Sequence, residues 1–267
     1  MKASPRAVRD AYIASAQAWS HGPEEVFAAM ADALVARCPI PVEGTTAVDL
    51  GTGSGVVARA LARGGARETL VDDAFDMLAL ARAAAGGSAA IADVRALPLR
   101  GACVDLACAG FVLNHLDRPG VALRDIVRAV RPGGAILAST WARGEEHPVK
   151  AATEEALLRR GWQRPAWYAH LKETTTPLTD TVEGLQRAAV SAGLDAADVS
   201  VVTVDLAGLP VDAMIAWRTN LPPNAPFVAA LAPDQRAALI AEIRDRLGTP
   251  VTALRLQMVA LSSRVAA

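Results

Sequence analysis

Three glycines at alternate positions, Gly51, Gly53 and Gly55, mark the stretch of this sequence that is best suited to bind a ligand. The apolar residues 45–50 before them predict a buried strand, and the apolar periodicity after them predicts a helix over 54–63. Glycine permits a left-handed backbone and lets a ligand approach without a Cβ in the way. The helix start offers unpaired N–H groups to a carboxylate or phosphate. The stretch therefore predicts a ligand site where the strand meets the helix.

Acidic residues follow two later predicted strands. Asp72 and Asp73 come directly after the second strand and Asp93 after the third, while Asp49, just before the glycine turn, is expected to accept hydrogen bonds from loop N–H groups. Because a carboxylate only accepts hydrogen bonds, it can hold the ribose hydroxyls of a nucleoside. This combination fits two cofactor classes, dinucleotides and S-adenosyl-L-methionine. The dinucleotide fingerprint needs a third glycine at position 56, where the sequence has Val56, and the observed spacing leaves more room for an amino-acid group.

Strands and helices alternate at short intervals through the first half of the chain. This alternation predicts a parallel, doubly wound sheet, in which ligands bind at the carboxyl ends of the strands. Two helices, 4–20 and 23–37, are predicted before it. The predicted strands are 45–50, 68–71, 89–91, 104–108 and 135–141, and the helices between them are 54–63, 74–85 and 119–131.

In the second half, strands and helices alternate less regularly. Helices are predicted over 149–160 and 181–192, and strands over 198–206 and 254–262. The segment 210–247 between these last strands contains an amphipathic helix and is too long for a hairpin loop, so we interpret it as an inserted helical cap. The fold class predicted is α/β, with a doubly wound, mostly parallel seven-stranded sheet, N-terminal helices and this cap.

Composition excludes several functional classes. The chain has 267 residues, 52% of them hydrophobic, and a net charge of -1, which gives no electrostatic footprint for nucleic acid or an anionic membrane. The three cysteines are odd in number and lack metal-type spacing. No window is apolar enough to span a membrane, and the first residues lack the apolar core of a signal peptide. We therefore expect a cytoplasmic protein, with its oligomeric state left open.

Four motifs in order carry a resemblance to a known family. They are VDLGTGSG (48–55), VDDAFDML (71–78), ADVRALPL (92–99) and VRAVRPGG (127–134). With them the chain resembles the class I S-adenosylmethionine-dependent methyltransferases, in the small-molecule branch similar to ubiquinone and menaquinone biosynthesis enzymes. The resemblance covers roughly 45–141, and the remainder matches in architecture only.

The resemblance implies one Rossmann-like methyltransferase domain over 1–267. Within it we expect an N-terminal helical lid (1–44), a cofactor-binding core (45–141) and cap or substrate segments (142–180 and 207–250).

The resemblance also implies roles for individual residues. The glycines would lie against the methionine part of the cofactor, and Asp72 would hold the ribose. Asp93 would accept from the adenine amine. Asp73 departs from the family, which usually has an apolar residue there. The full expected cofactor set is Asp49, Gly51, Thr52, Gly53, Gly55, Asp72, Asp73, Met77, Asp93, Val94, Ala109 and Phe111.

His115 is the candidate catalytic residue. It lies just past the fourth strand, where a neutral imidazole could take a proton from the methyl acceptor, and the alternative is that it simply caps the following turn. Aromatic side chains around a cavity suit a planar or apolar acceptor. Packing in the core is the alternative role for each of the aromatic candidates named next. The candidate substrate residues are Tyr12, Trp19, Asn114, Trp141, Tyr168 and Trp217. His147 and His170 with Glu145, Glu146 and Glu173 match no known metal geometry, so no metal is expected.

The expected activity is methyl transfer from S-adenosyl-L-methionine to a small, mostly apolar metabolite in cofactor or secondary-metabolite biosynthesis. The acceptor atom, oxygen, nitrogen or carbon, is left open, and no nucleic-acid or membrane partner is expected. The alternative is a fold of this kind that binds the cofactor but catalyses a cyclisation or rearrangement, because function does not follow from fold.

Overall fold

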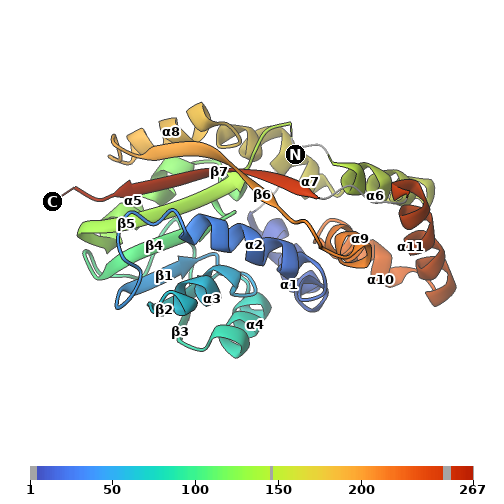
Figure 1. Cartoon of the computed structure of the whole chain (residues 1–267), viewed down its shortest axis with the longest axis horizontal. Helices are drawn as coiled ribbons and strands as arrows, with labels where there is room; N and C mark the ends of the chain where they lie inside the picture. The colour runs from blue at the N-terminus through green and yellow to red at the C-terminus, as the bar shows by residue number, and fades with distance from the viewer. Residues whose placement is uncertain (1–4, 145–146, 249–253, 267) are drawn as a thin grey trace.

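A seven-stranded sheet forms the centre of the computed structural model, which describes residues 5–144, 147–248 and 254–266 (Figure 1). The strand order is β3-β2-β1-β4-β5-β7-β6. Strands β1 to β5 are parallel, and β7 is antiparallel to both of its neighbours, β5 and β6. The predicted mostly parallel α/β sheet is confirmed. The strands are β1 (Thr46–Leu50), β2 (Arg67–Asp72), β3 (Ser88–Ile91), β4 (Val104–Gly110), β5 (Val130–Trp141), β6 (Asp198–Asp205) and β7 (Arg255–Arg264).

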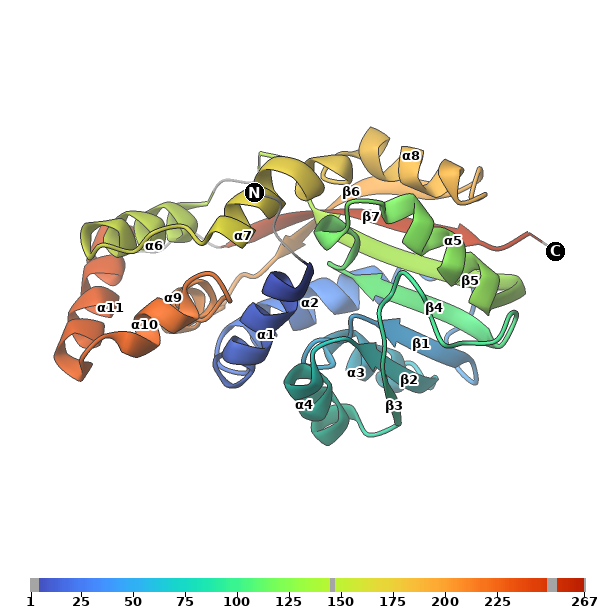
Figure 2. The ribbon, with the colours of Figure 1, turned by 180° about the vertical axis from the view of Figure 1, so that it is seen from behind.

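Helices cover both faces of this sheet (Figures 1 and 2). Helices α2 (Pro23–Val35), α3 (Val56–Arg63) and α4 (Phe75–Ala85) pack on one face. Helices α5 (Pro119–Ala129) and α8 (Val182–Ser191) pack on the other. Helix α1 (Pro5–Trp19) contacts α4, α7 (Ala166–His170) and α10 (Ala225–Ala230).

Because helices cover both faces of the sheet, the side chains on both faces are buried and mostly apolar. In β1, Ala47 joins the hydrophobic cluster on the α2 and α3 face, whereas Val48 and Leu50 join the cluster on the α5 and α8 face. Successive side chains of a strand point to opposite faces, so a strand covered on both sides reads as a continuous apolar run. Because β2, β1 and β4 are parallel neighbours, their carboxyl ends lie side by side at one edge of the sheet.

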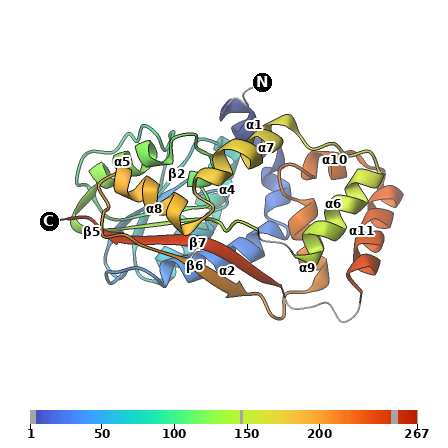
Figure 3. The same cartoon turned by 90° about the horizontal axis from the view of Figure 1, so that it is seen from above.

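The remaining helices form a lobe beyond one end of the sheet (Figure 3). We call α6 (Pro148–Arg159), α9 (Val211–Thr219), α10 and α11 (Pro233–Leu247) the cap helices. Leu157, Ile215 and Leu239 belong to a hydrophobic cluster that they share. Within 210–247 we predicted a single amphipathic helix beside Pro-rich turns, and the structure has three helices there. Helices α9 and α10 are too short to show a clear helical period in the sequence.

Two further segments have structure that the sequence analysis did not predict. The stretch 161–178 contains α7 and two short helical turns, η2 (Leu171–Thr175) and η3 (Thr176–Leu178). Strand β5 begins at Val130 because that residue already pairs with Val104, with a register shift before Leu106. No helix within the described part of the chain is both long enough and apolar enough to cross a membrane.

Candidate active site

The glycine turn after β1 needs glycine for two separate reasons. Gly51, Gly53 and Gly55 all have left-handed backbones, with φ of 62°, 55° and 84°. A Cβ on Gly51 would also lie 2.4 Å from Cγ2 of Val112, so the turn and the loop after β4 are in close contact. A Cβ on Gly53 would meet only Cε of Met77, at 3.6 Å. The turn is thus in close contact with Val112 at Gly51, whereas at Gly53 there is space for a ligand.

Asp49 braces this turn from inside the protein. Its Oδ2 accepts hydrogen bonds from Thr52 Oγ1 at 2.7 Å and from the Ala58 N–H at 3.0 Å. Burial raises the pKa of Asp49 to about 7. The carboxyl is only 1% exposed and does not line the cavity described below. The sequence predicted acceptance from loop N–H groups, but the N–H that Asp49 binds belongs to Ala58 in the first turn of α3, and the bond holds this turn against the end of β1.

Asp72 is held by two backbone groups at the end of β2. Its Oδ2 accepts from the Gly53 N–H and its Oδ1 accepts from the Ala74 N–H, each at 2.8 Å. Burial raises the pKa of this carboxyl to about 6. Each carboxylate oxygen has a further lone pair, and Asp72 lines the cavity, so the fixed carboxylate can accept two more hydroxyl donors.

Asp93 has a partner that the sequence analysis did not foresee. The backbone N–H and the guanidinium of Arg95 donate to both of its carboxylate oxygens. These hydrogen bonds lower the pKa of Asp93. The pair lies on the cavity wall beside Val94, at the end where the adenine was expected.

One cavity of about 850 Å³ runs from the glycine turn to the carboxyl ends of β4 and β5 and continues between α1 and the helices α6, α7 and α9. It brings together most of the predicted residues. Those that line it are Gly51, Thr52, Gly53, Asp72, Asp73, Met77, Asp93, Val94, Phe111, His115, Tyr12, Trp19, Asn114, Trp141, Tyr168 and Trp217.

Three residues of the expected cofactor set do not line this cavity. Besides Asp49, they are Gly55, whose backbone faces Ala81 of α4, and Ala109. Ala109 belongs to the hydrophobic cluster on the α5 and α8 face, because side chains alternate along β4. Its neighbour Gly110 lines the cavity instead.

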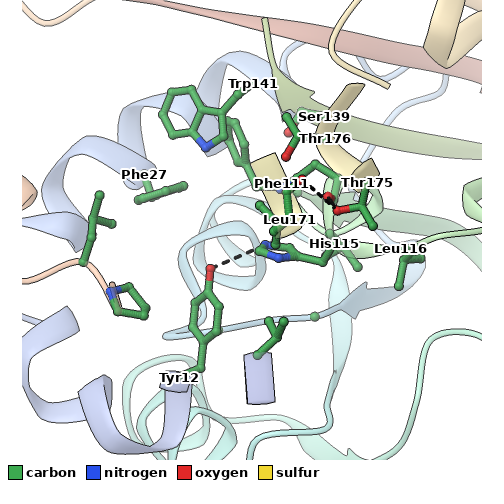
Figure 4. A pocket seen from close by; sticks show the side chains of 18 of the residues that line it. Tyr12, Phe27, Phe111, His115, Leu116, Ser139, Trp141, Leu171, Thr175 and Thr176 are labelled. Carbon is green, nitrogen blue, oxygen red and sulfur yellow. Dashed lines mark hydrogen bonds between the residues drawn. The ribbon is translucent and has the colours of Figure 1, made fainter. Parts of the chain in front are cut away.

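The far end of the cavity is walled by aromatic rings (Figure 4). The ring centroid of Phe111 lies 4.6 Å from that of Trp141 and 5.2 Å from that of Phe27. Trp217 follows at 6.3 Å from Trp141. Phe111 has a φ of 57°, which is rare for a residue with a side chain. Such backbones cluster at functional sites, and this one aims the ring toward Phe27 and Trp141.

His115 meets Tyr12 across this end of the cavity. The Tyr12 hydroxyl lies 3.4 Å from His115 Nε2, and the rings are T-shaped with centroids 5.7 Å apart. Burial, with a smaller effect of Lys172, lowers the pKa of His115 to about 4. The imidazole is therefore neutral at pH 7. Its Nδ1 is buried and has no hydrogen-bond partner among the described residues.

His147, one of the two histidines weighed as metal ligands, has a structural role. His147 Nδ1 accepts a hydrogen bond from the Lys150 N–H at the start of α6, and its ring stacks on Trp217. Burial lowers the pKa of His147 to about 3. Glu145 and Glu146 lie outside the described residues.

Several cavity residues were missed by sequence reasoning. Arg9, Arg95, Ser139 and Thr176 all line the cavity. The signal for Ser139 was present, because a period of two places it on the same face of β5 as Trp141. The arginines and Thr176 have no such local signal.

Comparison with known proteins agrees with this geometry. Residues 48–138 match the family model described as a methyltransferase domain. A ubiquinone biosynthesis O-methyltransferase of Methylobacterium sp. is 32% identical over 199 residues, 72% of this chain and 72% of that protein. A ubiquinone/menaquinone biosynthesis C-methyltransferase of Rubrivivax gelatinosus is 37% identical over 103 residues. That second match spans 38% of this chain and less than half, 41%, of its relative.

Solved structures show the same fold. A complex between the Haloferax volcanii Trm112 methyltransferase activator and a methyltransferase matches with a TM-score of 0.58 at 21% identity, covering 97% of this chain and 98% of that one. A 4+2 cyclase matches with a TM-score of 0.50 at 18% identity, covering 89% and 80%. At these identities the likeness is evidence for the fold alone.

The chain belongs to the class I S-adenosylmethionine-dependent methyltransferases. It is an S-adenosylmethionine-dependent methyltransferase, and S-adenosyl-L-methionine is its cofactor. The residues present fit that cofactor. Asp72 offers a fixed acceptor pair, Gly53 leaves space where a Cβ would stand, and the cavity continues from both toward Phe111.

Proposed function

We propose that this enzyme transfers a methyl group to a hydroxyl oxygen of a small, mostly apolar, ring-containing metabolite. The observation that carries the proposal is the neutral, buried His115 beside Tyr12 at the aromatic end of the cavity. An aromatic wall of Phe27, Phe111 and Trp141 favours a flat apolar molecule.

The cofactor side of the reaction assigns roles to this chain's residues. When bound, S-adenosyl-L-methionine supplies a methyl group that is already activated. We assign Asp72 to the ribose hydroxyls, the glycine turn to the methionine part, and Val94 and Asp93 to the adenine. Phe111 would wall the reacting region and exclude water. Orientation of this kind can lower the barrier by ~7–11 kcal/mol without a strong base.

The acceptor side requires a place for one proton. A hydroxyl loses its proton as its oxygen forms the bond to the methyl group. His115 Nε2, unprotonated at neutral pH, would receive that proton, and the Tyr12 hydroxyl would hold the ring in position. The contact between them, at 3.4 Å, is long for a hydrogen bond, so an acceptor hydroxyl can compete for Nε2.

The names of the relatives support small-molecule biosynthesis as the setting, with one named for O-methyl and one for C-methyl transfer. The alternative without methyl transfer has weaker support, because the cyclase likeness is one of fold at 18% identity.

Label transfer tests the proposal. The protein is incubated with methyl-labelled S-adenosyl-L-methionine and a panel of naphthols, aromatic amines and enolisable diketones, and the products are analysed by mass spectrometry. We expect label on the oxygen of the naphthols. Label confined to nitrogen or carbon would contradict the hydroxyl assignment. Converted acceptor without label would favour the cyclisation alternative.

A further inference from the structure

Two buried hydroxyls at the acceptor end of the cavity have no role in the steps above. Ser139 on β5 is 0% exposed and Thr176 in η3 is 6% exposed, and both line the cavity. Ser139 Oγ and Thr176 Oγ1 have no hydrogen-bond partner within the described part of the chain. Figure 4 labels both side chains on the wall of the cavity that Phe111 and Trp141 also line. A buried hydroxyl without a partner is unfavourable, and because these two residues line the cavity, a bound ligand can supply the missing partner.

Neighbouring hydroxyls on the same segments are satisfied by the protein itself. Thr140, next to Ser139, donates to the Thr179 carbonyl at 2.7 Å. Thr175, next to Thr176, donates to the Asn114 carbonyl at 2.9 Å. Hydrogen bonds therefore join the two segments to each other and to the loop after β4. The hydroxyls of Ser139 and Thr176 take no part in these bonds and can still bind a ligand in the cavity.

The chemistry of the pair defines what it can bind. A hydroxyl both donates and accepts, and it carries no charge. A ketone oxygen has two lone pairs and can accept from Ser139 and Thr176 together, and a hydroxyl oxygen can accept from one and donate to the other. Both are neutral groups that an otherwise apolar molecule can carry into an aromatic cavity.

We propose that Ser139 and Thr176 form a polar subsite for a ketone or hydroxyl oxygen of the acceptor, separate from the oxygen that receives the methyl group. This rests on the proposed function, because that function places the reacting hydroxyl at His115. The acceptor is then an apolar ring frame with two oxygen substituents, one at His115 and one at Ser139 and Thr176. Molecules without the second oxygen bind more weakly.

Two matched probes test the subsite. One is a hydroxytetralone, a phenol with a ring ketone, and the other is the tetrahydronaphthol with the same skeleton but no ketone. Binding of each is measured by calorimetry to the protein saturated with S-adenosylhomocysteine. We expect the wild-type protein to prefer the hydroxytetralone by about 10-fold, the effect of one or two hydrogen bonds. Ser139→Ala and Thr176→Val should each remove most of this preference and leave tetrahydronaphthol binding unchanged.

The control variants are Ser15→Ala and Thr153→Val. Both residues are 1% exposed with unpartnered hydroxyls among the described residues, and neither lines the cavity. They should keep the wild-type preference. Equal losses of both probes in Ser139→Ala and Thr176→Val would indicate a structural role and overturn the proposal, as would a wild-type protein without preference. Because binding needs no turnover, a preference lost in these variants supports the subsite even where no methyl label is transferred, an outcome that would contradict only the proposed function.

Discussion

The hydroxyl of Tyr12 lies 3.4 Å from Nε2 of His115, although 103 residues separate them in sequence. The contact joins α1 to the loop after β4, directly over the acceptor end of the cavity. Burial raises the pKa of Tyr12 well above its usual value, so its hydroxyl keeps its proton near neutral pH. Since the same burial keeps His115 neutral, the pair is a proton donor facing a proton acceptor when the imidazole carries its proton on Nδ1.

Replacing His115 tests its role as the proton acceptor. We expect His115→Gln to lower kcat about 100-fold, because general base catalysis contributes at least that much. At saturating cofactor, the wild-type kcat should stay level as pH falls through 6.5 and drop only toward pH 4, where the imidazole becomes protonated. The control is His21→Gln, an exposed residue between α1 and α2. A wild-type rate that halves near pH 6.5 would contradict the neutral, buried imidazole.

Asp72 should control cofactor affinity. In Asp72→Asn, the amide NH₂ must face the N–H of either Gly53 or Ala74, so one hydrogen bond is lost and a charged acceptor is removed. We expect S-adenosylhomocysteine to bind about 10- to 100-fold more weakly by calorimetry. Wild-type affinity should also fall as pH drops below about 6, where the carboxylate takes up a proton. Asp76→Asn, exposed in the first turn of α4, serves as the control and should bind normally.

Asp49 should make stability depend on pH. Folding raises the pKa of Asp49 from its ordinary value of 3.8 to about 7, so the folded state holds this proton more tightly than the unfolded chain. Its contribution to stability is full below pH 3.8 and is lost as pH rises toward 7. Asparagine keeps the acceptor oxygen for Thr52 and Ala58 without titrating. Relative to wild type, Asp49→Asn should therefore gain about 1–3 kcal/mol of unfolding free energy as pH rises through this window, measured by urea melts. A difference that stays constant with pH would contradict the assignment.

Gly51 should be less replaceable than other left-handed glycines. Alanine at Gly51 meets both an unfavourable φ and the side chain of Val112 at 2.4 Å. Alanine at Gly44 meets only the unfavourable φ of 76°, with nothing within 4 Å. We expect Gly51→Ala to cost about 1–3 kcal/mol more in unfolding free energy than Gly44→Ala. Equal costs in denaturant melts would show that the turn and the loop after β4 are not in close contact.

The features that could be predicted from the sequence are those that depend on residues close together in the chain. The glycine turn and the strand-end carboxylates Asp72 and Asp93 lie in short runs whose turn chemistry and alternation are visible residue by residue. The partner of Asp93 could not be predicted, because nothing in the spacing shows that Arg95 turns back onto it. The meeting of Tyr12 and His115 was equally invisible, since it depends on how α1 packs against the cap and α4.

The position of β7 sets an order in which this enzyme can be completed. It is the last strand in sequence, yet it lies between β5 and β6 and pairs with both. The sheet therefore stays in two parts until β7 is made and inserted, and the helices α9 to α11 precede it in the chain. As the chain emerges during synthesis, the half that holds Asp72 can form early, because β1 to β5 pair without β7. Trp217 on the cavity wall belongs to α9, which packs against α2 and α6 and precedes β7 in the chain, so it is the joining of β6 to the sheet that has to wait for the final strand.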